Sequence, residues 1–425
     1  MIEWRRHLYS VLFYLLLPFM LLRLWWRGRV APGYRQGVGA RLGFMGNLHF
    51  KQRPLWIHAV SVGETIAVAP FVERFLAENP NIPVVMTSMT PTGAARAKDI
   101  FGERITHLFC PYDLPCAMTR FVKAIDPCGL LVVETELWPN MIATCARKQI
   151  PIVIANARLS VRSAKGYRRF KKLAAGMLSK LSLLVAQHQD DAARFVELGL
   201  PEERCIVSGS IKFDITLPSQ IIDQGEKLRA QLGGRPTLIL ASSHEGEERL
   251  FLDLLVDMKE QCPNLLVMLV PRHPERFAAV WQLCHEYSQR VVRCSDDDGV
   301  SNDCDIYLGD TMGQLMRFYA AADIAVMGGS FIKVGGHNPV EPACLGLPVV
   351  MGPHHYNFQA ISEQMQKSGG MVIVDSKGEL KTQLLSLLSN PDEASKMGEK
   401  AALFAASQRG ALERLYAEVL KQIKD

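Results

Sequence analysis

The sequence predicts an α/β protein made of two doubly wound domains, each with a parallel sheet that carries helices on both faces. Its 425 residues exceed what a single hydrophobic core usually serves. After residue 50, short β-rich apolar runs alternate with segments that suit helices, as in parallel sheets. The runs fall into two sets, separated by the polar passage "LPSQIIDQGEKLRAQLGGRP". We therefore expect one domain at 27–216, a linker at 217–236 and a second domain at 237–425, with a cleft between the domains.

The first 26 residues have a composition of their own and are predicted to associate with a membrane. The run "LYSVLFYLLLPFMLL" is uncharged and, extended to Trp26, approaches the ~20 residues of a membrane-spanning helix. Five arginines between residues 23 and 41 follow it, so the positive-inside rule places the body of the protein in the cytoplasm. Pro18 is compatible with a helix that spans the bilayer and with one that lies in its interface. The plainer alternative is the buried first helix of a soluble domain.

Ten apolar runs are predicted to be buried strands. They lie at 55–60, 83–88, 130–134, 151–155 and 183–187 in the first domain, and at 237–242, 265–270, 305–308, 323–327 and 347–351 in the second. In open parallel sheets, ligands bind beyond the carboxyl ends of the strands. The turns from strand to helix are therefore the places to search for a site.

Three turns of the first domain carry polar side chains. In "SVGET", Ser61 and Glu64 have the Ser-x-x-Glu spacing of a capping box, and a catalytic base would occupy the same place. Thr90 precedes a proline and is predicted to cap the next helix. In "ETELWPN", Glu134 and Glu136 follow a strand and share one side if the strand continues. Helix capping is the plainer explanation of each turn.

The richest turn of the second domain is "GGSFIKVGGHNPVEPACLG" at 328–346, with two glycine pairs. Asn338 is predicted to be an N-cap, Pro339 the first helical residue and Glu341 the third. Such a helix start can bind phosphate, and Glu341 could accept hydrogen bonds from ribose hydroxyls. Neither a P-loop nor a Gly-x-Gly-x-x-Gly fingerprint is present in the sequence, which disfavours a P-loop NTPase and a dinucleotide site.

The stretch from Leu137 to Gln189 contains ten basic residues and no acidic one. Its densest part includes Arg162, Lys165, Arg168, Arg169, Lys171 and Lys172. This composition indicates an anionic partner, and the apolar N-terminus favours a phosphorylated lipid or a membrane surface over nucleic acid. The ten cysteines have neither Cys-x-x-Cys nor zinc-ligand spacing, so we expect reduced thiols without a metal.

Ten motifs in one order resemble the 3-deoxy-D-manno-octulosonic acid (Kdo) transferases of Gram-negative bacteria. They are "SVGET", "TSMTPTG", "PYDLP", "ETELWPN", "NARLS", "GSIKFD", "HEGEE", "VPRHPERF", "GDTMGQL" and "GGHNPVE". The resemblance implies a GT-B glycosyltransferase with two Rossmann-like domains, the acceptor on the first and CMP-Kdo on the second. It implies lipid IVA, the lipid A precursor, as acceptor, lipopolysaccharide core biosynthesis at the cytoplasmic side of the inner membrane, and no cofactor. The number of Kdo units added does not follow from it.

The resemblance also assigns residues to the site. Glu64 corresponds to the family's general base. The CMP contacts correspond to Pro271, Arg272, Met312, Gly313, Gln314, Asn338, Pro339, Val340 and Glu341. Two of these positions depart from the family pattern, because Gln314 replaces a Glu and Val340 replaces a Leu.

Other residues and other functions remain open. Glu134 or Glu136 could orient the acceptor or Glu64, and the basic stretch with Arg162, Arg168 and Arg169 could hold the lipid's phosphates. One alternative function is a GT-B transferase that uses a UDP-sugar on a lipid. The other is a sugar-nucleotide epimerase of the same fold, which would need no membrane segment.

Overall fold

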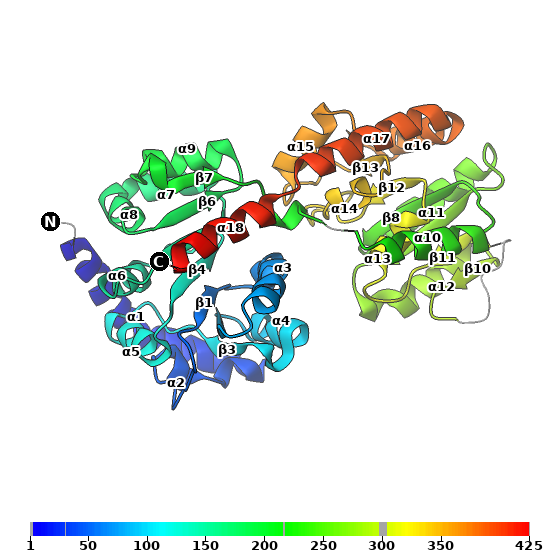
Figure 1. Cartoon of the computed structure of the whole chain (residues 1–425). Helices are drawn as coiled ribbons and strands as arrows, with labels where there is room; N and C mark the ends of the chain where they lie inside the picture. Colours follow the sequence, from blue (N-terminus) through cyan, green and yellow to red (C-terminus); the bar gives the residue numbers. More distant parts are fainter. Residues whose placement is uncertain (1–2, 30, 216, 297–303, 425) are drawn as a thin grey trace. The chain divides into compact units, whose positions relative to one another are not determined.

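The computed structural model describes residues 3–29, 31–215, 217–296 and 304–424 (Figure 1). The chain forms two compact units. Unit 1 comprises Met1–Asp214 and Gly410–Asp425, and unit 2 comprises Ile215–Arg409. Each unit has one parallel sheet with helices packed against it, which confirms the predicted α/β class.

Unit 1 has a seven-stranded sheet in the order β3-β2-β1-β4-β5-β6-β7. The strands are β1 (Leu55–His58), β2 (Val84–Ser88), β3 (Thr106–Phe109), β4 (Gly129–Val133), β5 (Ile152–Ala157), β6 (Leu183–Ala186) and β7 (Cys205–Val207). The helices are α1 (Glu3–Arg27), α2 (Val38–Arg41), α3 (Val62–Glu78), α4 (Pro91–Phe101), α5 (Pro115–Ile125), α6 (Pro139–Arg147), α7 (Val161–Arg169), α8 (Lys171–Leu178), α9 (Gln189–Glu197) and α18 (Ala411–Lys424). As predicted, Thr90 caps α4, because its Oγ1 accepts from the Gly93 amide at 3.1 Å.

Unit 2 also has seven parallel strands, in the order β10-β11-β9-β8-β12-β13-β14. They are β8 (Thr237–Ser243), β9 (Leu266–Pro271), β10 (Val291–Arg293), β11 (Ile306–Leu308), β12 (Ile324–Met327), β13 (Val349–Met351) and β14 (Met371–Ile373). The helices are α10 (Ser219–Gln231), α11 (Glu247–Lys259), α12 (Phe277–Tyr287), α13 (Leu315–Ala320), α14 (Val340–Ala343), α15 (Gln359–Lys367), α16 (Lys377–Ser389) and α17 (Pro391–Ser407).

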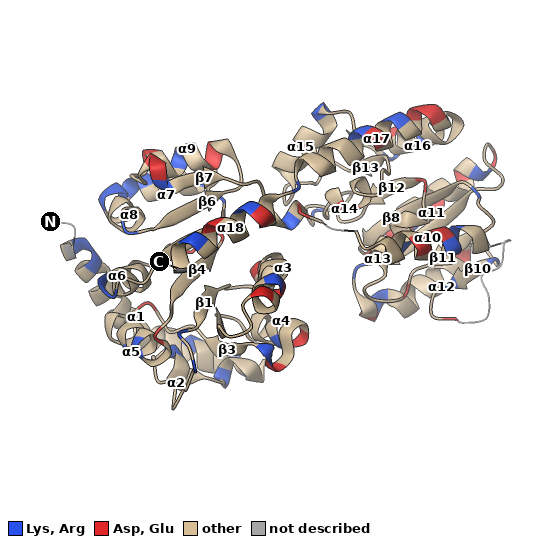
Figure 2. Ribbon diagram, viewed as in Figure 1, with Lys and Arg blue, Asp and Glu red and all other residues tan. Residues whose placement is uncertain are grey.

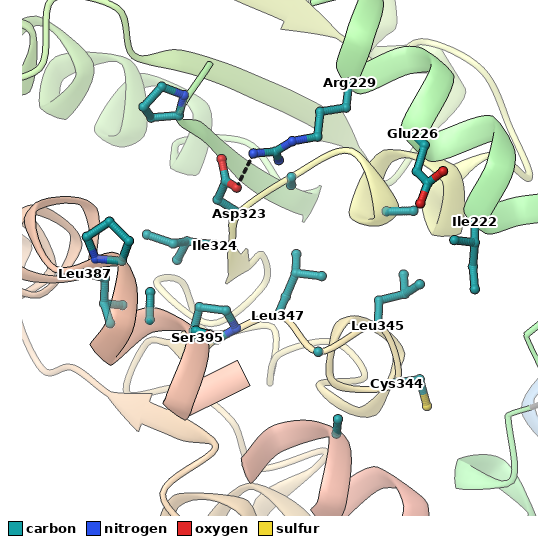
Figure 3. A pocket seen from close by; sticks show the side chains of 18 of the residues that line it. Ile222, Glu226, Arg229, Asp323, Ile324, Cys344, Leu345, Leu347, Leu387 and Ser395 are labelled. Atoms are coloured by element: carbon teal, nitrogen blue, oxygen red, sulfur yellow. Dashed lines mark ion pairs between the residues drawn. The ribbon is translucent and has the colours of Figure 1, made fainter. Parts of the chain in front are cut away.

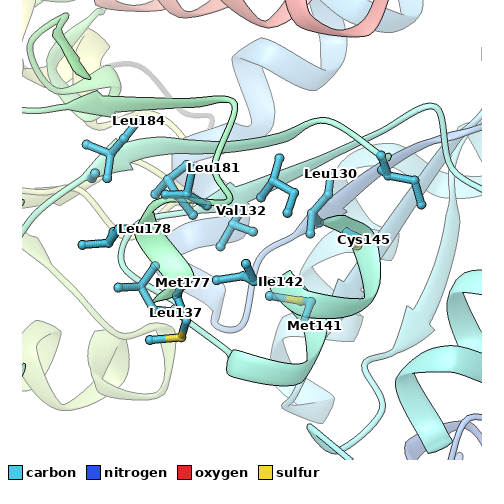
Figure 4. Packing of buried hydrophobic residues seen from close by; sticks show 14 of the residues in the cluster. Leu130, Val132, Leu137, Met141, Ile142, Cys145, Met177, Leu178, Leu181 and Leu184 are labelled. Carbon is cyan, nitrogen blue, oxygen red and sulfur yellow. The ribbon is translucent and has the colours of Figure 1, made fainter. Parts of the chain in front are cut away.

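Side chains of the unit 1 strands alternate between two cores, one on each face of the sheet. Leu130 and Val132 of β4 pack with α6 and α8, as Figure 4 shows for Met141 of α6. Leu131 and Val133, on the same strand, belong to the opposite core with α3, α4 and α18. Because both faces are covered, the central strands are continuous apolar runs, and this is why the sequence reveals them.

Two of the predicted domain boundaries are wrong. The passage 217–236 is mostly the helix α10, which packs against α13 within unit 2, and Gly225 allows the close approach to Ala320. The last residues, placed by prediction in the second domain, belong to unit 1. There α18 packs Leu415 and Tyr416 into the core beside α3, and Asp214 Oδ2 accepts from the Leu412 amide at 2.7 Å.

Candidate active site

Glu64 lies in the first turn of α3, after the carboxyl end of β1, and takes part in capping the helix. Ser61 is the N-cap residue, and its Oγ accepts from the Glu64 amide at 3.4 Å. The Ser61 hydroxyl donates to Glu64 Oε1 at 2.8 Å, and the Val60 amide donates to Oε2 at 2.7 Å. The Ser61 half of the predicted capping box is therefore present. The Glu64 carboxylate accepts from the amide one residue before the N-cap, where a capping box has the N-cap amide.

The protonation of Glu64 is finely balanced. The residue is 8% exposed, and this burial raises its pKa from 4.5 to about 7. The hydrogen bonds from Ser61 and Val60 oppose the rise in pKa, whereas the charges of Glu136 and Glu134 add to it. A carboxyl with a pKa near the working pH is suited to accept a proton in a reaction. Capping and general-base catalysis are thus compatible at this residue.

The two other carboxylates of this region lie near Glu64 but differ in their partners. β4 ends before Glu134, whose φ of 61° is left-handed, so the strand does not continue through both residues. Glu134 forms an ion pair with Lys212, and Glu136 Oε2 accepts from Trp138 Nε1 at 2.7 Å. Burial raises the pKa of Glu136. Among the three carboxyl groups, Glu134 is therefore the one with a cationic partner in the described part of the chain.

The densest basic part of the acid-free stretch lies on α7 and α8, where Figure 2 shows basic residues in blue. Arg162, Arg168 and Arg169 are all exposed. Arg168 forms an ion pair with Glu197 of α9 at 2.6 Å, so part of its charge is compensated. The exposed apolar side chains of Val161 and Phe170 lie among these basic residues.

The predicted nucleotide-binding segments lie together at the carboxyl ends of the strands in the unit 2 sheet. Four neighbouring strands have the order β11-β9-β8-β12, so the turns that follow them are adjacent. Pro271 ends β9, Arg272 follows it, and Glu341 lies after β12. Burial raises the pKa of Glu341, and the hydrogen bond from Asn338 and the charge of Arg272 oppose this rise.

The helix start in this region differs from the prediction. α14 begins at Val340, and Pro339 takes the N-cap position that was expected for Asn338. Asn338 Oδ1 still accepts from the Val340 amide at 3.1 Å, and Asn338 Nδ2 donates to Glu341 Oε1 at 3.3 Å. Because α14 has a single turn, its dipole adds little, and an anion here would depend on the charge of Arg272.

The glycine pairs that capping does not explain are required by the backbone. Gly329, Gly335 and Gly336 have φ of 67°, 106° and 75°. The amides of Gly335 and Gly336 donate to the Gly329 carbonyl at 3.0 and 2.7 Å, which closes the loop upon itself. A Cβ on Gly328 would lie 2.5 Å from the Ser242 carbonyl oxygen.

Buried carboxylates of "HEGEE" fix this loop and the turn after β9. Glu247 accepts from the amides of Gly329 at 2.7 Å, Phe331 at 3.0 Å and His244 at 2.9 Å. Glu248 binds Arg276 through both oxygens, at 2.6 and 3.1 Å. Both glutamates therefore position the site instead of facing a ligand.

The segment after β11 supplies the remaining candidate contacts. Met312 is exposed and Gly313 has a φ of 80°. Gln314 Oε1 accepts from Arg317 Nη1 at 2.7 Å. The amide that replaces the family's carboxylate thus already has a cationic partner within unit 2.

Two histidines of the same edge were not predicted as site residues. The rings of His244 and His337 are stacked, with centroids 5.2 Å apart and Nε2 atoms at 2.9 Å. Burial lowers the pKa of His337 to about 4, and the pKa of His244 is lowered too. Sequence reasoning also missed Lys212. His244, His337 and Lys212 lie in "HEGEE", "GGHNPVE" and "GSIKFD". Their partners are distant in the sequence, since His244 contacts His337 and Lys212 contacts Glu134.

A cavity of about 770 Å³ in unit 2 lies away from this edge. Residues that precede strands line it, among them Pro236, Asp323 and Pro348, so it lies at the amino ends of the strands. Figure 3 shows its apolar wall and the ion pair between Arg229 and Asp323, whose N–O distance is 2.7 Å. It therefore does not coincide with the candidate nucleotide site.

Comparison with known proteins identifies the family. A family model described as "3-Deoxy-D-manno-octulosonic-acid transferase (kdotransferase)" matches residues 36–215. The chain is 37% identical over 413 residues to the 3-deoxy-D-manno-octulosonic acid transferase of Haemophilus influenzae. The aligned part covers 96% of this chain and 97% of that relative. The chain belongs to this Kdo transferase family.

Further comparisons agree with the family and with the fold. The Kdo transferase of Bordetella pertussis is 33% identical over 422 residues, covering 96% of this chain and 97% of that protein. A model of group 1 glycosyl transferases matches residues 284–404, so this Kdo transferase family member is a glycosyltransferase with the predicted GT-B class of fold. The solved UDP-GlcNAc 2-epimerase of Neisseria meningitidis covers 87% of this chain and 100% of its own, with a TM-score of 0.57 and 14% identity. At that identity the likeness concerns the fold alone.

Proposed function

We propose that the protein transfers Kdo from CMP-Kdo to lipid IVA, with Glu64 as the general base. The observation that carries this proposal is a buried carboxyl with a pKa of about 7 at the carboxyl end of a central strand, in a chain of the Kdo transferase family. Ionised Glu64 takes the proton of an acceptor hydroxyl as its oxygen attacks the anomeric carbon of Kdo. The bond from that carbon to the phosphate oxygen breaks, and CMP leaves with the bonding electrons.

The donor binds at the carboxyl edge of unit 2. Arg272 places positive charge where the departing phosphate gains negative charge, and such a contact strengthens in the transition state. Glu341 and Asn338 contact the nucleotide's ribose, and the segment from Met312 to Gln314, with Pro271 and Val340, completes the wall. Support comes from the adjacency of these turns in the sheet and from the electrostatic effect of Arg272 on Glu341.

The acceptor binds to unit 1, and the enzyme works at the cytoplasmic face of the inner membrane. The exposed arginines of α7 attract the phosphates of lipid IVA and the anionic lipid surface. Burial raises the proton affinity of Glu64, and the charges of Glu136 and Glu134 add to it. The apolar helix α1, long enough to cross a bilayer by length and composition, supports membrane association.

A transfer assay with the purified full chain, CMP-Kdo and lipid IVA tests the proposal directly. A thermal-shift titration with CMP and with UDP accompanies it. We expect Kdo-lipid product and stabilisation by CMP. Stabilisation by UDP alone would favour the rival UDP-sugar transferase.

A further inference from the structure

Helix α1 is docked along unit 1 by one of its faces. Arg6, Ser10 and Leu24, which span most of its length, are buried. Between them, Phe13, Leu17, Met20 and Leu21 pack against Tyr112, Leu114 and Ala117. The helix is continuous from Glu3 to Arg27, through Pro18. It is therefore an element of the folded unit and not a free segment that precedes it.

A buried polar network fixes the first half of this docked face. Arg6 Nη1 donates to Asn140 Oδ1 at 3.0 Å, and the Ser10 hydroxyl donates to the same oxygen at 3.2 Å. Asp113 accepts from the amides of Asn140 at 2.9 Å and Met141 at 2.8 Å. These contacts give a structural purpose to "PYDLP" and to the last residues of "ETELWPN". Separating α1 from unit 1 would break the hydrogen bonds of Arg6 and Ser10, and moving these polar groups into the acyl chains without partners would cost about 1–3 kcal/mol for each group.

The opposite face of α1 is apolar and exposed. Its exposed apolar and aromatic side chains are Trp4, Leu8, Val11, Leu12, Tyr14, Leu15, Leu16, Phe19, Leu22, Trp25 and Trp26. The tryptophans lie at the two ends of the helix, where amphipathic rings suit the level of lipid headgroups. Arg23, Arg27 and Arg29 near the carboxyl end are exposed as well, and they complement anionic lipid.

A helix that crosses a bilayer must be surrounded by lipid or by other spanning elements. Along α1, one face is occupied by unit 1, and that face carries Arg6 in a polar network. We propose that α1 lies in the plane of the membrane surface, with its docked face on unit 1, its apolar face among the acyl chains, and no part of α1 crossing the bilayer. This inference rests on the proposed membrane association and adds the orientation of the helix.

Three leucines of the apolar face make the orientation measurable. Leu8, Leu15 and Leu22 are 61%, 67% and 62% exposed and are spaced by two turns. A nitroxide is attached at each position in turn, through a genetically encoded azide that spares the native cysteines. The full-length variants are reconstituted in vesicles of phosphatidylethanolamine and phosphatidylglycerol. Depth is measured by spin-label accessibility to oxygen and to a water-soluble nickel complex.

The two orientations predict different depth profiles. An in-plane helix gives the same shallow depth, about 5–10 Å below the headgroups, at all three positions. A spanning helix separates positions 8 and 22 by about 21 Å along the bilayer normal, with position 15 deepest. The second profile would overturn the proposal. A dimeric protein whose labels are accessible neither to oxygen nor to the nickel complex would also overturn the proposal. The apolar face would then be covered by a second copy of the chain.

A matched pair of cysteines tests the docked face separately. A short bifunctional thiol reagent should cross-link Ser10→Cys with Asn140→Cys in the membrane-bound protein, since the parent side chains are hydrogen-bonded at 3.2 Å. Ser10→Cys with Thr119→Cys, on the neighbouring helix α5, is the control. Failure to cross-link with the first pair, while the protein melts like the parent, contradicts docking. A transfer assay on the same vesicles distinguishes failure of this inference from failure of the proposed reaction.

Discussion

At the scale of single residues, Glu64 combines a helix-capping contact with a titratable carboxyl, and one substitution separates the two. Glu64→Gln keeps an amide oxygen for capping but cannot take a proton. Near pH 4.5, where the Glu64 carboxyl is still protonated in the folded protein, we expect a melting temperature within a degree or two of the parent, the scale of a few tenths of a kcal/mol. CMP binding should persist, and Kdo transfer should be at least ~100-fold slower. The measurements are a transfer assay with lipid IVA and a melting curve.

Ser61→Ala is the matched control for this substitution. It removes the N-cap, which costs about 1 kcal/mol of stability, and leaves the carboxylate in place. It should therefore lower the melting temperature more and the rate less than Glu64→Gln. Turnover of Glu64→Gln near the parental rate would contradict the base assignment and make Glu136 and Glu134 the next candidates.

The raised pKa of Glu64 has two consequences with opposite pH dependence. The ionised fraction, and with it the rate of transfer, should rise with pH through about 7. Stability runs the other way, because the folded state holds the proton more tightly than the unfolded state. The contribution of Glu64 to stability is complete below about 4.5 and is lost as pH rises through about 7. Relative to the parent, Glu64→Gln should therefore gain melting temperature between pH 4.5 and 7, and a constant difference would contradict the shifted pKa.

Arg272 and Glu341 are predicted to bind the donor nucleotide with unequal weight. A charge-assisted hydrogen bond from Arg272 to phosphate contributes about 1.5–3 kcal/mol, so Arg272→Ala should weaken CMP binding by on the order of tenfold or more. Glu341→Gln should be milder, since an amide oxygen still accepts from Asn338 Nδ2 and from ribose. Calorimetry measures both affinities. Arg249→Ala removes an exposed arginine of the same unit and serves as control; unchanged CMP affinity in both test variants would move the donor site elsewhere.

The sequence predicts which residues form the site, but it does not predict the pKa values and contacts of their side chains. Ser61 and Glu64 are predictable because a local spacing at a strand end specifies them. The pKa of Glu64 is not, because burial and the charges of Glu134 and Glu136 arise from folding distant segments together. The same limit explains why the contact between His244 and His337 escaped prediction.

At the scale of elements, the ten predicted strands are all present, and the four that were missed are β3, β7, β10 and β14. Each is the edge strand of its sheet. Edge strands are paired on one side, and the residues of these four are mostly half-buried. They therefore lack the continuous apolar run by which central parallel strands are recognised.

The glycine loop after β12 depends on one carboxylate from another element. Glu247 of α11 accepts three backbone amides, and a glutamine cannot, because its NH₂ group faces donors. We expect Glu247→Gln to destabilise unit 2 by about 1–3 kcal/mol and to weaken CMP binding. Glu245→Gln, an exposed neighbour, is the control and should change neither. Urea unfolding measures the stability and calorimetry measures the affinity for CMP. If Glu247→Gln is as stable as the parent, the conformation of the loop does not depend on Glu247.

At the scale of the whole molecule, unit 1 is built from two segments that are far apart in the sequence. The chain passes from unit 1 to unit 2 after Asp214 and returns after Arg409. The sequence conceals this return, because α18 reads as one more amphipathic helix after the second set of strands. Its assignment depends on which core receives Leu415 and Tyr416, and that is unit 1.

This arrangement predicts how the chain can be divided. Residues 215–409 form a complete unit that contains every predicted CMP contact, so this fragment should fold alone and bind CMP about as well as the full chain. Residues 1–214 lack α18, whose Ala411, Leu415, Tyr416 and Val419 are at most 2% exposed. Losing the burial of the three larger side chains, at about 1.5–3 kcal/mol each, removes much of the ~5–15 kcal/mol that stabilises a domain. The fragment 1–214 should therefore be unstable in detergent, and joining residues 410–425 to it through a flexible Gly/Ser linker should restore a cooperative melting transition. Equal stability with and without α18 would contradict the assignment of this helix to unit 1.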